Sequence, residues 1–181
     1  MQVFAHGGIC VSDGKGAVYL DPSRGRPDGV VTHAHSDHLR PQTHMTPATA
    51  EVMHARTGSR KAQLHGYRAP FTVRGIEVEF YDAGHVIGSA MVAVDGGRVL
   101  YTGDFNPYGT ITAGRAEPQR CETLVIEATY GKPEQVLPAR QRVLRDLQGW
   151  MLAVAANGGG IVGAYTLGKA QEVVAAANAA G

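Results

Sequence analysis

The stretch VTHAHSDHL, residues 31–39, contains three histidines and one aspartate within the six positions from 33 to 38. Imidazole nitrogen and carboxylate oxygen are common protein ligands for zinc and related divalent ions. The histidine cluster follows GVVT, residues 29–32, a short β-branched run that is typical of a buried strand. Alternate side chains of an extended chain point to the same side, so we expect His33 and His35 to face a common point.

Asp37 and His38 follow directly, where a turn can direct them toward a neighbouring point. One loop would thus offer two ligands to each of two metal ions, which two-metal hydrolases hold about 3.5–4 Å apart. The alternative is a polar surface loop that happens to be rich in histidine. A metal site differs from such a loop because it requires further ligands elsewhere in the chain.

Residues that can bind metals stand at the ends of four further predicted strands. Asp21 ends YLDP, and His85 lies in AGHVIGSA, next to glycines that allow close backbone approach. Asp104 lies in YTGDF, and Glu127 lies in VIEATYG. Five such clusters at strand ends favour a metal centre over a surface loop.

The composition indicates a globular protein. The 181 residues suffice for one compact domain, or for one domain and part of another. A hydrophobic share of 44% with 18% charged residues argues against disorder. The net charge of +1 neither indicates a nucleic-acid binder nor excludes one that contacts phosphate through metals.

The cysteine pattern and the lack of a long apolar segment indicate the cellular compartment. Cys10 and Cys121 form no CxxC pair, which predicts reduced thiols rather than a disulfide framework. The first residues do not resemble a signal peptide, and the apolar residues 150–165 are interrupted by Asn157 and three glycines. We therefore expect a cytoplasmic protein without membrane association.

The order of predicted elements indicates an α/β fold in two parts. Short strands dominate the first part, with a helix at 46–58, a β region at 71–103 and an apolar strand at 123–130. Turn residues gather at 131–133. Helices at 139–156 and 169–180 then flank a predicted strand at 159–165, a pattern typical of a parallel α/β unit.

HAHSDH, residues 33–38, is similar to the HxHxDH signature of the metallo-β-lactamase superfamily, whose fold is an α/β sandwich of αββα layers. AGHVIGSA, TGDF, EATYG and AYTLGKAQEV resemble the β-CASP branch, which holds nucleases. The resemblance runs from about Ile9 to the last residue. It is strongest to DNA-ligase-associated exonucleases of the Artemis type, and RNA 3′-end processing nucleases are the nearest alternative.

The resemblance implies a metallo-β-lactamase domain over residues 1–131 and the beginning of a β-CASP insertion over 132–181. It also implies a role for each motif residue. The first metal is expected to bind His33, His35 and His85, the second Asp37 and His38, and Asp104 is expected to bridge both. Asp21 is expected to orient ligating imidazoles, as outer carboxylates do, and Glu127 to hydrogen-bond at the centre.

Asp37, Asp104 and Glu127 are the expected catalytic residues, and Asp37 is expected to orient the attacking water. The expected cofactors are two divalent ions, with zinc preferred and manganese as the alternative. The remaining histidines match no motif and are expected to have no direct role: His6, His44, His54 and His65.

The sequence departs from the β-CASP pattern in two places. No histidine follows His85, although relatives carry further histidine motifs that supply a proton donor and a ligand of the second metal. We therefore expect a C-terminally truncated chain whose first metal site is the tighter. In GDFNPYGT, Asn106-Pro107-Tyr108 stands where many relatives have a basic residue, which puts a phosphate contact there in doubt.

The resemblance implies a metal-dependent exonuclease, or its N-terminal part, acting on DNA or RNA strand ends. RNA 3′-end processing by an endonuclease or exonuclease is one alternative. A thioesterase- or lactonase-like hydrolase and a catalytically inactive scaffold are the others. The family also implies a DNA ligase, a helicase or RNA-processing proteins as partners.

Overall fold

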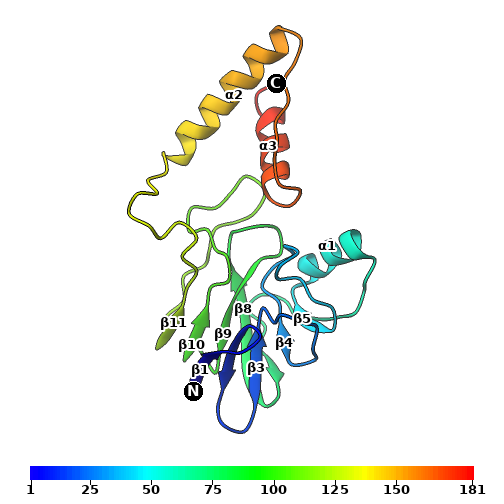
Figure 1. Ribbon diagram of the computed structural model, residues 1–181, viewed down its shortest axis with the longest axis vertical. Coiled ribbons are helices and arrows are strands. Elements are labelled where there is room, and N and C mark those ends of the chain that lie inside the picture. Colours follow the sequence, from blue (N-terminus) through cyan, green and yellow to red (C-terminus); the bar gives the residue numbers. More distant parts are fainter. The chain divides into compact units, whose positions relative to one another are not determined.

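The computed structural model describes residues 1–181 in two compact units, Met1–Glu127 and Ala128–Gly181 (Figure 1). The first unit holds strands β1 to β11 and helix α1, and the second holds helices α2 and α3. A division after residue 131, with the second part as the start of an insertion, stays a prediction.

The strands of the first unit form two sheets. One sheet has six strands in sequence order: β1 (Gln2–Ala5), β2 (Ile9–Ser12), β3 (Ala17–Leu20), β4 (Gly29–Val30), β5 (Thr43–Met45) and β6 (Ala62–Leu64). Strands β1 to β3 pair antiparallel, whereas β3 to β6 pair parallel. The strand predicted from GVVT is thus present but short.

The second sheet has five strands in the order β11-β10-β9-β8-β7. Their bounds are β7 (Phe71–Val73), β8 (Ile76–Asp82), β9 (Ala90–Val94), β10 (Val99–Tyr101) and β11 (Thr123–Val125). All neighbours pair antiparallel except β10 and β11, which are parallel. Residues 95–97 form the hairpin connection between β9 and β10.

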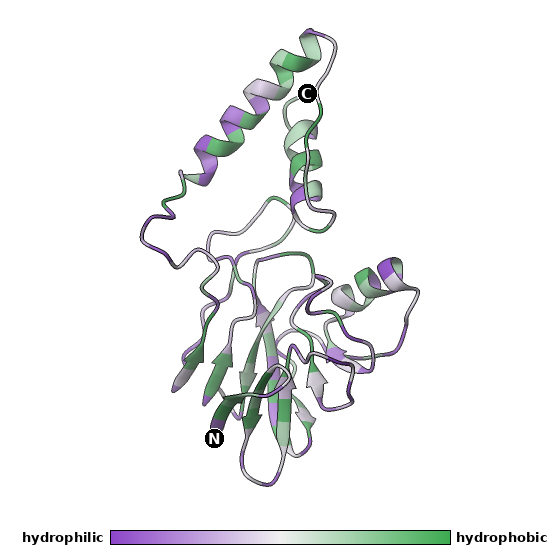
Figure 2. Cartoon of the chain, viewed as in Figure 1, coloured by the Kyte–Doolittle hydropathy of each residue, from purple (hydrophilic) through white to green (hydrophobic).

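The two sheets pack face to face, because a single hydrophobic cluster contains residues of both. Val18, Leu20 and Val30 come from the first sheet, and Phe80 and Val92 from the second. All five are fully buried. Figure 2 shows hydrophobic residues concentrated on these strands. The expected α/β sandwich is therefore present, and its two-layer arrangement brings the strand ends of both sheets to one region.

Helix α1 (Pro47–Thr57) begins and ends where its sequence predicts. Thr46 caps it by accepting a hydrogen bond from the Thr49 amide at 3.2 Å, and Gly58 ends it at φ 72°. The Thr46 and Thr49 hydroxyls also donate to the Gly88 carbonyl, at 2.7 and 2.9 Å. These bonds join the helix start to the loop between β8 and β9.

The second unit contains α2 (Arg140–Ala156) and α3 (Lys169–Asn178), which contact each other. Arg140 forms an ion pair with Glu172, and the Gln148 side chain donates to the carbonyl of buried Ala176 at 3.3 Å. Both predicted helices are confirmed. No helix of the chain combines the length and hydrophobicity needed to cross a bilayer.

The strand predicted at residues 159–165 is wrong. This segment pairs with no other strand, and Ile161 is 97% exposed. A strand needs a neighbour for its backbone hydrogen bonds, and residues 128–181 contain no other strand. The strand predicted at 123–130 is likewise shorter than expected, because β11 ends at Val125.

A histidine pair lies between the two sheets, away from the HAHSDH stretch. His44 Nδ1 is 2.8 Å from His65 Nε2, and His44 Nε2 is 3.0 Å from the Pro27 carbonyl oxygen. The His65 ring stacks on Phe71 with centroids 3.6 Å apart. Burial lowers the pKa of both histidines, and His44 lowers that of His65 further. Cys10 and Cys121 are free thiols, as predicted.

Replacing Phe80 with alanine is expected to lower the free energy of unfolding by about 3–5 kcal/mol, because it removes the largest fully buried side chain and leaves a cavity. Leu124→Ala, at a half-exposed position of β11, serves as the control and is expected to change it by no more than about 0.5 kcal/mol. Urea denaturation measures both. Equal losses would contradict the central position of Phe80.

The histidine pair predicts acid sensitivity. Both folded-state pKa values lie below the unfolded value of about 6.5. The pair's contribution to the free energy of unfolding is therefore complete above that pH. It is lost as the pH falls below that value toward the lower folded-state pKa. His44→Gln is expected to weaken this dependence, by about 1.4 kcal/mol for each unit by which the His44 pKa is lowered. Denaturation at pH 7.5 and 5.5 tests this, and the prediction fails if both proteins show the same pH dependence.

Candidate metal centre

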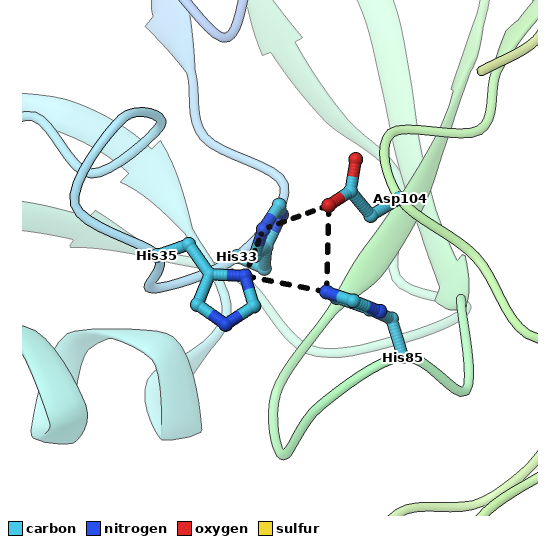
Figure 3. Close-up of side chains that lie close together, drawn as sticks. All are labelled: His33, His35, His85 and Asp104. Carbon is cyan, nitrogen blue, oxygen red and sulfur yellow. Dashed lines mark hydrogen bonds and ion pairs between the residues drawn. The ribbon is translucent and has the colours of Figure 1, made fainter. Parts of the chain in front are cut away.

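Four of the predicted ligands converge at the strand ends (Figure 3). His33 and His35 follow β4, His85 follows β8 and Asp104 follows β10. Each offers one ligand atom, and these four atoms lie within 4.8 Å of one another. Figure 3 shows the three imidazoles and the carboxylate turned toward a common point. The residues come from both sheets, so the sandwich itself assembles the cluster.

Four of the spacings within the cluster are close to those around a tetrahedral metal ion. His35 Nδ1 is 2.9 Å from His33 Nε2 and 3.3 Å from His85 Nε2. Asp104 Oδ2 is 3.4 Å from His85 Nε2 and 3.6 Å from His33 Nε2. Tetrahedral zinc with ligands at about 2.0–2.1 Å places those ligands about 3.3 Å apart. The donor set therefore suits a divalent metal ion.

The charge states of the cluster also suit a metal. Burial, together with the neighbouring histidines, lowers the pKa of His33 to about 2. His33 is therefore neutral, which is the form that binds metals. Burial raises the pKa of Asp104, and Glu127 adds to the rise while His38 opposes it. A bound cation reverses such a rise, because it favours the ionised carboxylate.

His38 and Asp37 lie beside the four-residue cluster rather than within it. The His38 ring packs against His33 with centroids 4.3 Å apart. His38 Nε2 is 3.5 Å from Asp37 Oδ2, and the Asp37 side chain is 77% exposed. Burial alone lowers the pKa of His38, but Asp21, Asp37 and Asp104 outweigh it and raise the pKa above its usual value. These acidic neighbours make the surroundings of His38 favourable for a cation.

Asp21 is the most heavily hydrogen-bonded carboxylate near the cluster. Its Oδ1 accepts from the Thr32 amide at 2.8 Å. Its Oδ2 accepts from the Thr32 hydroxyl at 2.8 Å and from the Tyr101 hydroxyl at 3.0 Å, and lies 2.9 Å from His38 Nδ1. Asp21 thus contacts one predicted ligand directly, in the position of an outer carboxylate that orients an imidazole.

Glu127 holds the backbone behind Asp104. Its Oε1 accepts a hydrogen bond from the Phe105 amide at 3.3 Å, and its own amide donates to the Thr102 hydroxyl at 3.3 Å. Both bonds connect the end of β11 to the turn that carries Asp104. The contacts are to the backbone around a ligand.

The His85 loop depends on a glycine and a serine. Ser89 Oγ accepts from the amides of His85 and Val86, at 3.1 and 3.2 Å. Gly88 has φ 81°, and a Cβ there would lie 2.5 Å from the Thr49 amide nitrogen. Only glycine fits this close approach to α1 without displacement.

No protein-family model matches the chain, but it is similar to several known proteins. It is 35% identical to an RNase J-like protein of Methanocaldococcus jannaschii over 116 residues, which is 61% of this chain and 28% of the relative. It is 33% identical to cleavage and polyadenylation specificity factor subunit 3 of Dictyostelium discoideum over 112 residues, 60% of this chain and 14% of the relative. These similarities support the resemblance to nucleases of the β-CASP branch of the metallo-β-lactamase superfamily.

A third relative matches over more of this chain's length. It is a probable DNA ligase of Opitutus terrae, 29% identical over 167 residues, which is 86% of this chain and 16% of the relative. A solved metallo beta lactamase of Hirschia baltica is 17% identical with a TM-score of 0.39, covering 52% of this chain and 57% of that one. The chain spans only 14–28% of the length of the three relatives named.

The structure brings together part of the predicted β-CASP ligand set. His33, His35, His85 and Asp104 form one cluster, and Asp37 and His38 lie next to it. The role of each residue, and a second metal, stay predictions. The histidines given no role lie outside the four-residue cluster: His6, His44, His54 and His65.

Sequence reasoning missed Thr32 and Tyr101, the two side chains that hydrogen-bond Asp21. Thr32 immediately precedes the first histidine, and Tyr101 precedes the TGD stretch. Their positions beside motifs were the only available signal, because their contact with Asp21 depends on the fold.

We expect one ion per chain to survive dialysis, because only the first set offers four converging protein ligands. His85→Ala is expected to abolish this retention, whereas Asp37→Ala should leave it unchanged. His6→Ala, at an exposed histidine outside the cluster, is the control. Elemental analysis of the dialysed protein measures the ratio. Two ions retained equally by the unsubstituted protein would contradict the expected asymmetry.

Proposed function

We propose that the chain supplies the metal centre of a phosphodiesterase that hydrolyses DNA or RNA. The observation that carries this proposal is the convergence of His33, His35, His85 and Asp104, with His38 packed against His33. A second cation beside His38 would complete the two-metal arrangement that hydrolases of phosphate esters use.

The relatives support a nucleic-acid substrate. Their names include an RNase J-like protein, an endoribonuclease YSH1 of Yarrowia lipolytica and a probable DNA ligase. Two of these names refer to RNA and one to DNA. We propose hydrolysis of the phosphodiester bond at a strand end as the shared chemistry, and the choice of polymer is decided by the experiment below.

The proposed ligands divide into two sets. His33, His35 and His85 would hold the first ion, Asp37 and His38 the second, and Asp104 would contact both. When bound, such ions lower the pKa of a water molecule and stabilise charge on the phosphodiester oxygens. Zinc is the proposed metal, since imidazole and carboxylate suit it, and manganese is the alternative.

Asp37 is the residue proposed to orient the attacking water. Its carboxylate is 77% exposed, so water and substrate can reach it. Its Oδ2 also lies 3.5 Å from His38 Nε2, which keeps it near the cluster. Glu127 is proposed to act on the position of Asp104, through the hydrogen bond from the Phe105 amide.

The finer alternatives make different predictions. Digestion from an end indicates an exonuclease, whereas internal cleavage near an RNA 3′ end indicates a processing endonuclease. The similarity to a probable DNA ligase supports a proposal that ligase or helicase proteins are partners, and the RNase J-like relative supports RNA-processing partners instead. A cytoplasmic location belongs to the same proposal.

The test uses the full-length gene product with Zn²⁺ or Mn²⁺ and end-labelled single-stranded DNA and RNA of equal length. Asp37→Ala/His38→Ala is expected to reduce cleavage by more than about 100-fold, since losing ligands exceeds the 10–100-fold typical of losing a supporting hydrogen bond. His6→Ala should cleave as the unsubstituted protein does. Gel analysis of the products also shows the direction of digestion.

Three results would overturn the proposal. Cleavage that survives the double substitution would remove Asp37 and His38 from the mechanism. Hydrolysis of a thioester or lactone without cleavage of either polymer would favour a small-molecule hydrolase. Absence of all three activities in a metal-loaded protein would favour an inactive scaffold.

A further inference from the structure

Thr32 contacts every segment that carries a ligand of the first metal set, although it is not itself a ligand. Its side chain is buried, with 1% exposure. Its hydroxyl oxygen lies 2.8 Å from Asp21 Oδ2 and 2.9 Å from His33 Nδ1. The hydroxyl therefore stands directly between a carboxylate and a predicted metal ligand.

The direction of these hydrogen bonds follows from counting protons. An ionised carboxylate only accepts, and Asp21 is surrounded by four potential donors: the Thr32 amide, the Thr32 hydroxyl, the Tyr101 hydroxyl and His38 Nδ1. A hydroxyl has one proton, and that of Thr32 is directed to Asp21. Toward His33 the same oxygen can only accept, so the proton of the neutral imidazole lies on Nδ1.

This tautomer determines whether His33 can bind a metal. With the proton on Nδ1, the lone pair of Nε2 faces His35 Nδ1 and Asp104 Oδ2, at 2.9 and 3.6 Å. The opposite tautomer would direct an N–H into the cluster and remove one ligand. A second hydrogen bond on the other ring nitrogen commonly sets the choice in metal-binding histidines.

Thr32 also contacts the loops that carry His85 and Asp104, through its backbone carbonyl and its side chain. Its carbonyl accepts from the Ala90 amide at 2.8 Å, at the end of the His85 loop. A Cβ on Gly103 would lie 2.7 Å from the Thr32 hydroxyl oxygen, so the turn before Asp104 packs directly against this side chain. These contacts depend on the size of residue 32, whereas the tautomer depends on its hydroxyl.

We propose that Thr32 is a positioning residue. Its hydroxyl donates a hydrogen bond to the Asp21 carboxylate and accepts one from His33 Nδ1, and this holds His33 in the tautomer that binds metal. The Asp21 carboxylate thus orients one imidazole of each proposed metal set. It contacts His38 directly, and it acts on His33 through the Thr32 hydroxyl. The inference rests on the metal centre of the proposed function, but not on its substrate.

Two substitutions separate the hydroxyl from the shape. Thr32→Val keeps the branched shape and removes the hydroxyl, whereas Thr32→Ser keeps the hydroxyl and removes a methyl group. Thr43→Val is the matched control. Thr43 is also fully buried in the first sheet, and its hydroxyl donates to the Arg40 carbonyl at 2.6 Å.

The first measurement is metal affinity, by competition titration with Zn²⁺ and by the visible absorption of bound Co²⁺. Thr32→Val is expected to raise the dissociation constant of the tighter ion about 10–100-fold. Thr32→Ser and Thr43→Val should stay close to the unsubstituted protein. A folded Thr32→Val protein with unchanged affinity would overturn the proposal, as would Thr32→Ser weakening binding as much as Thr32→Val.

The second measurement is the position of the imidazole proton in the metal-free protein, by nitrogen-detected NMR of histidine side chains. The unsubstituted protein and Thr32→Ser should carry the His33 proton on Nδ1. A proton on Nε2 of the unsubstituted protein would overturn the proposal even if Thr32→Val does not fold. Neither measurement uses substrate, so a protein without nuclease activity would contradict only the proposed function.

Discussion

Burial of two apolar sheet faces against each other is the interaction on which the metal centre depends. Asp21 and His33 stand at strand ends of the first sheet, and His85 and Asp104 at strand ends of the second. The shared core, with Phe80 at 0% exposure, holds these strand ends at a common edge. Apolar burial contributes about 25 cal/mol for each Å² removed from water, and it has no direction. It can therefore bring the sheets together, but other contacts must set their register.

Hydrogen bonds between the sheets supply that direction. The Tyr101 hydroxyl, on β10, donates to Asp21 at the end of β3, and the Ala90 amide, on β9, donates to the Thr32 carbonyl after β4. Buried polar groups are costly unless they are paired, so these bonds favour one relative placement of the sheets. The same carboxylate that joins the sheets also contacts His38. The Asp21 carboxylate thus contributes both to the packing of the sheets and to the position of a predicted ligand.

The second unit shows the limit of local pattern. Residues 159–165 have the composition of a strand, but they are unpaired and Ile161 is 97% exposed. Helices α2 and α3 were predictable because helical hydrogen bonds form within one segment. A strand depends on a neighbour distant in sequence, and residues 128–181 provide none. Of the predicted helix, strand and helix in this unit, only the two helices are present.

The sequence by itself determined the ligand types, their grouping at strand ends and the start and end of α1. These features are local: HAHSDH lies within six positions, and Thr46 and Gly58 bound their own helix. Only the tertiary structure decided which ligands share a point, that Asp37 is exposed beside the cluster, and that Thr32 and Tyr101 surround Asp21. Tyr101 and Asp21 are 80 positions apart, and their contact exists only after two sheets have closed over one core. Spacing along the chain contains no information about such a contact, because the packing of the sheets determines it.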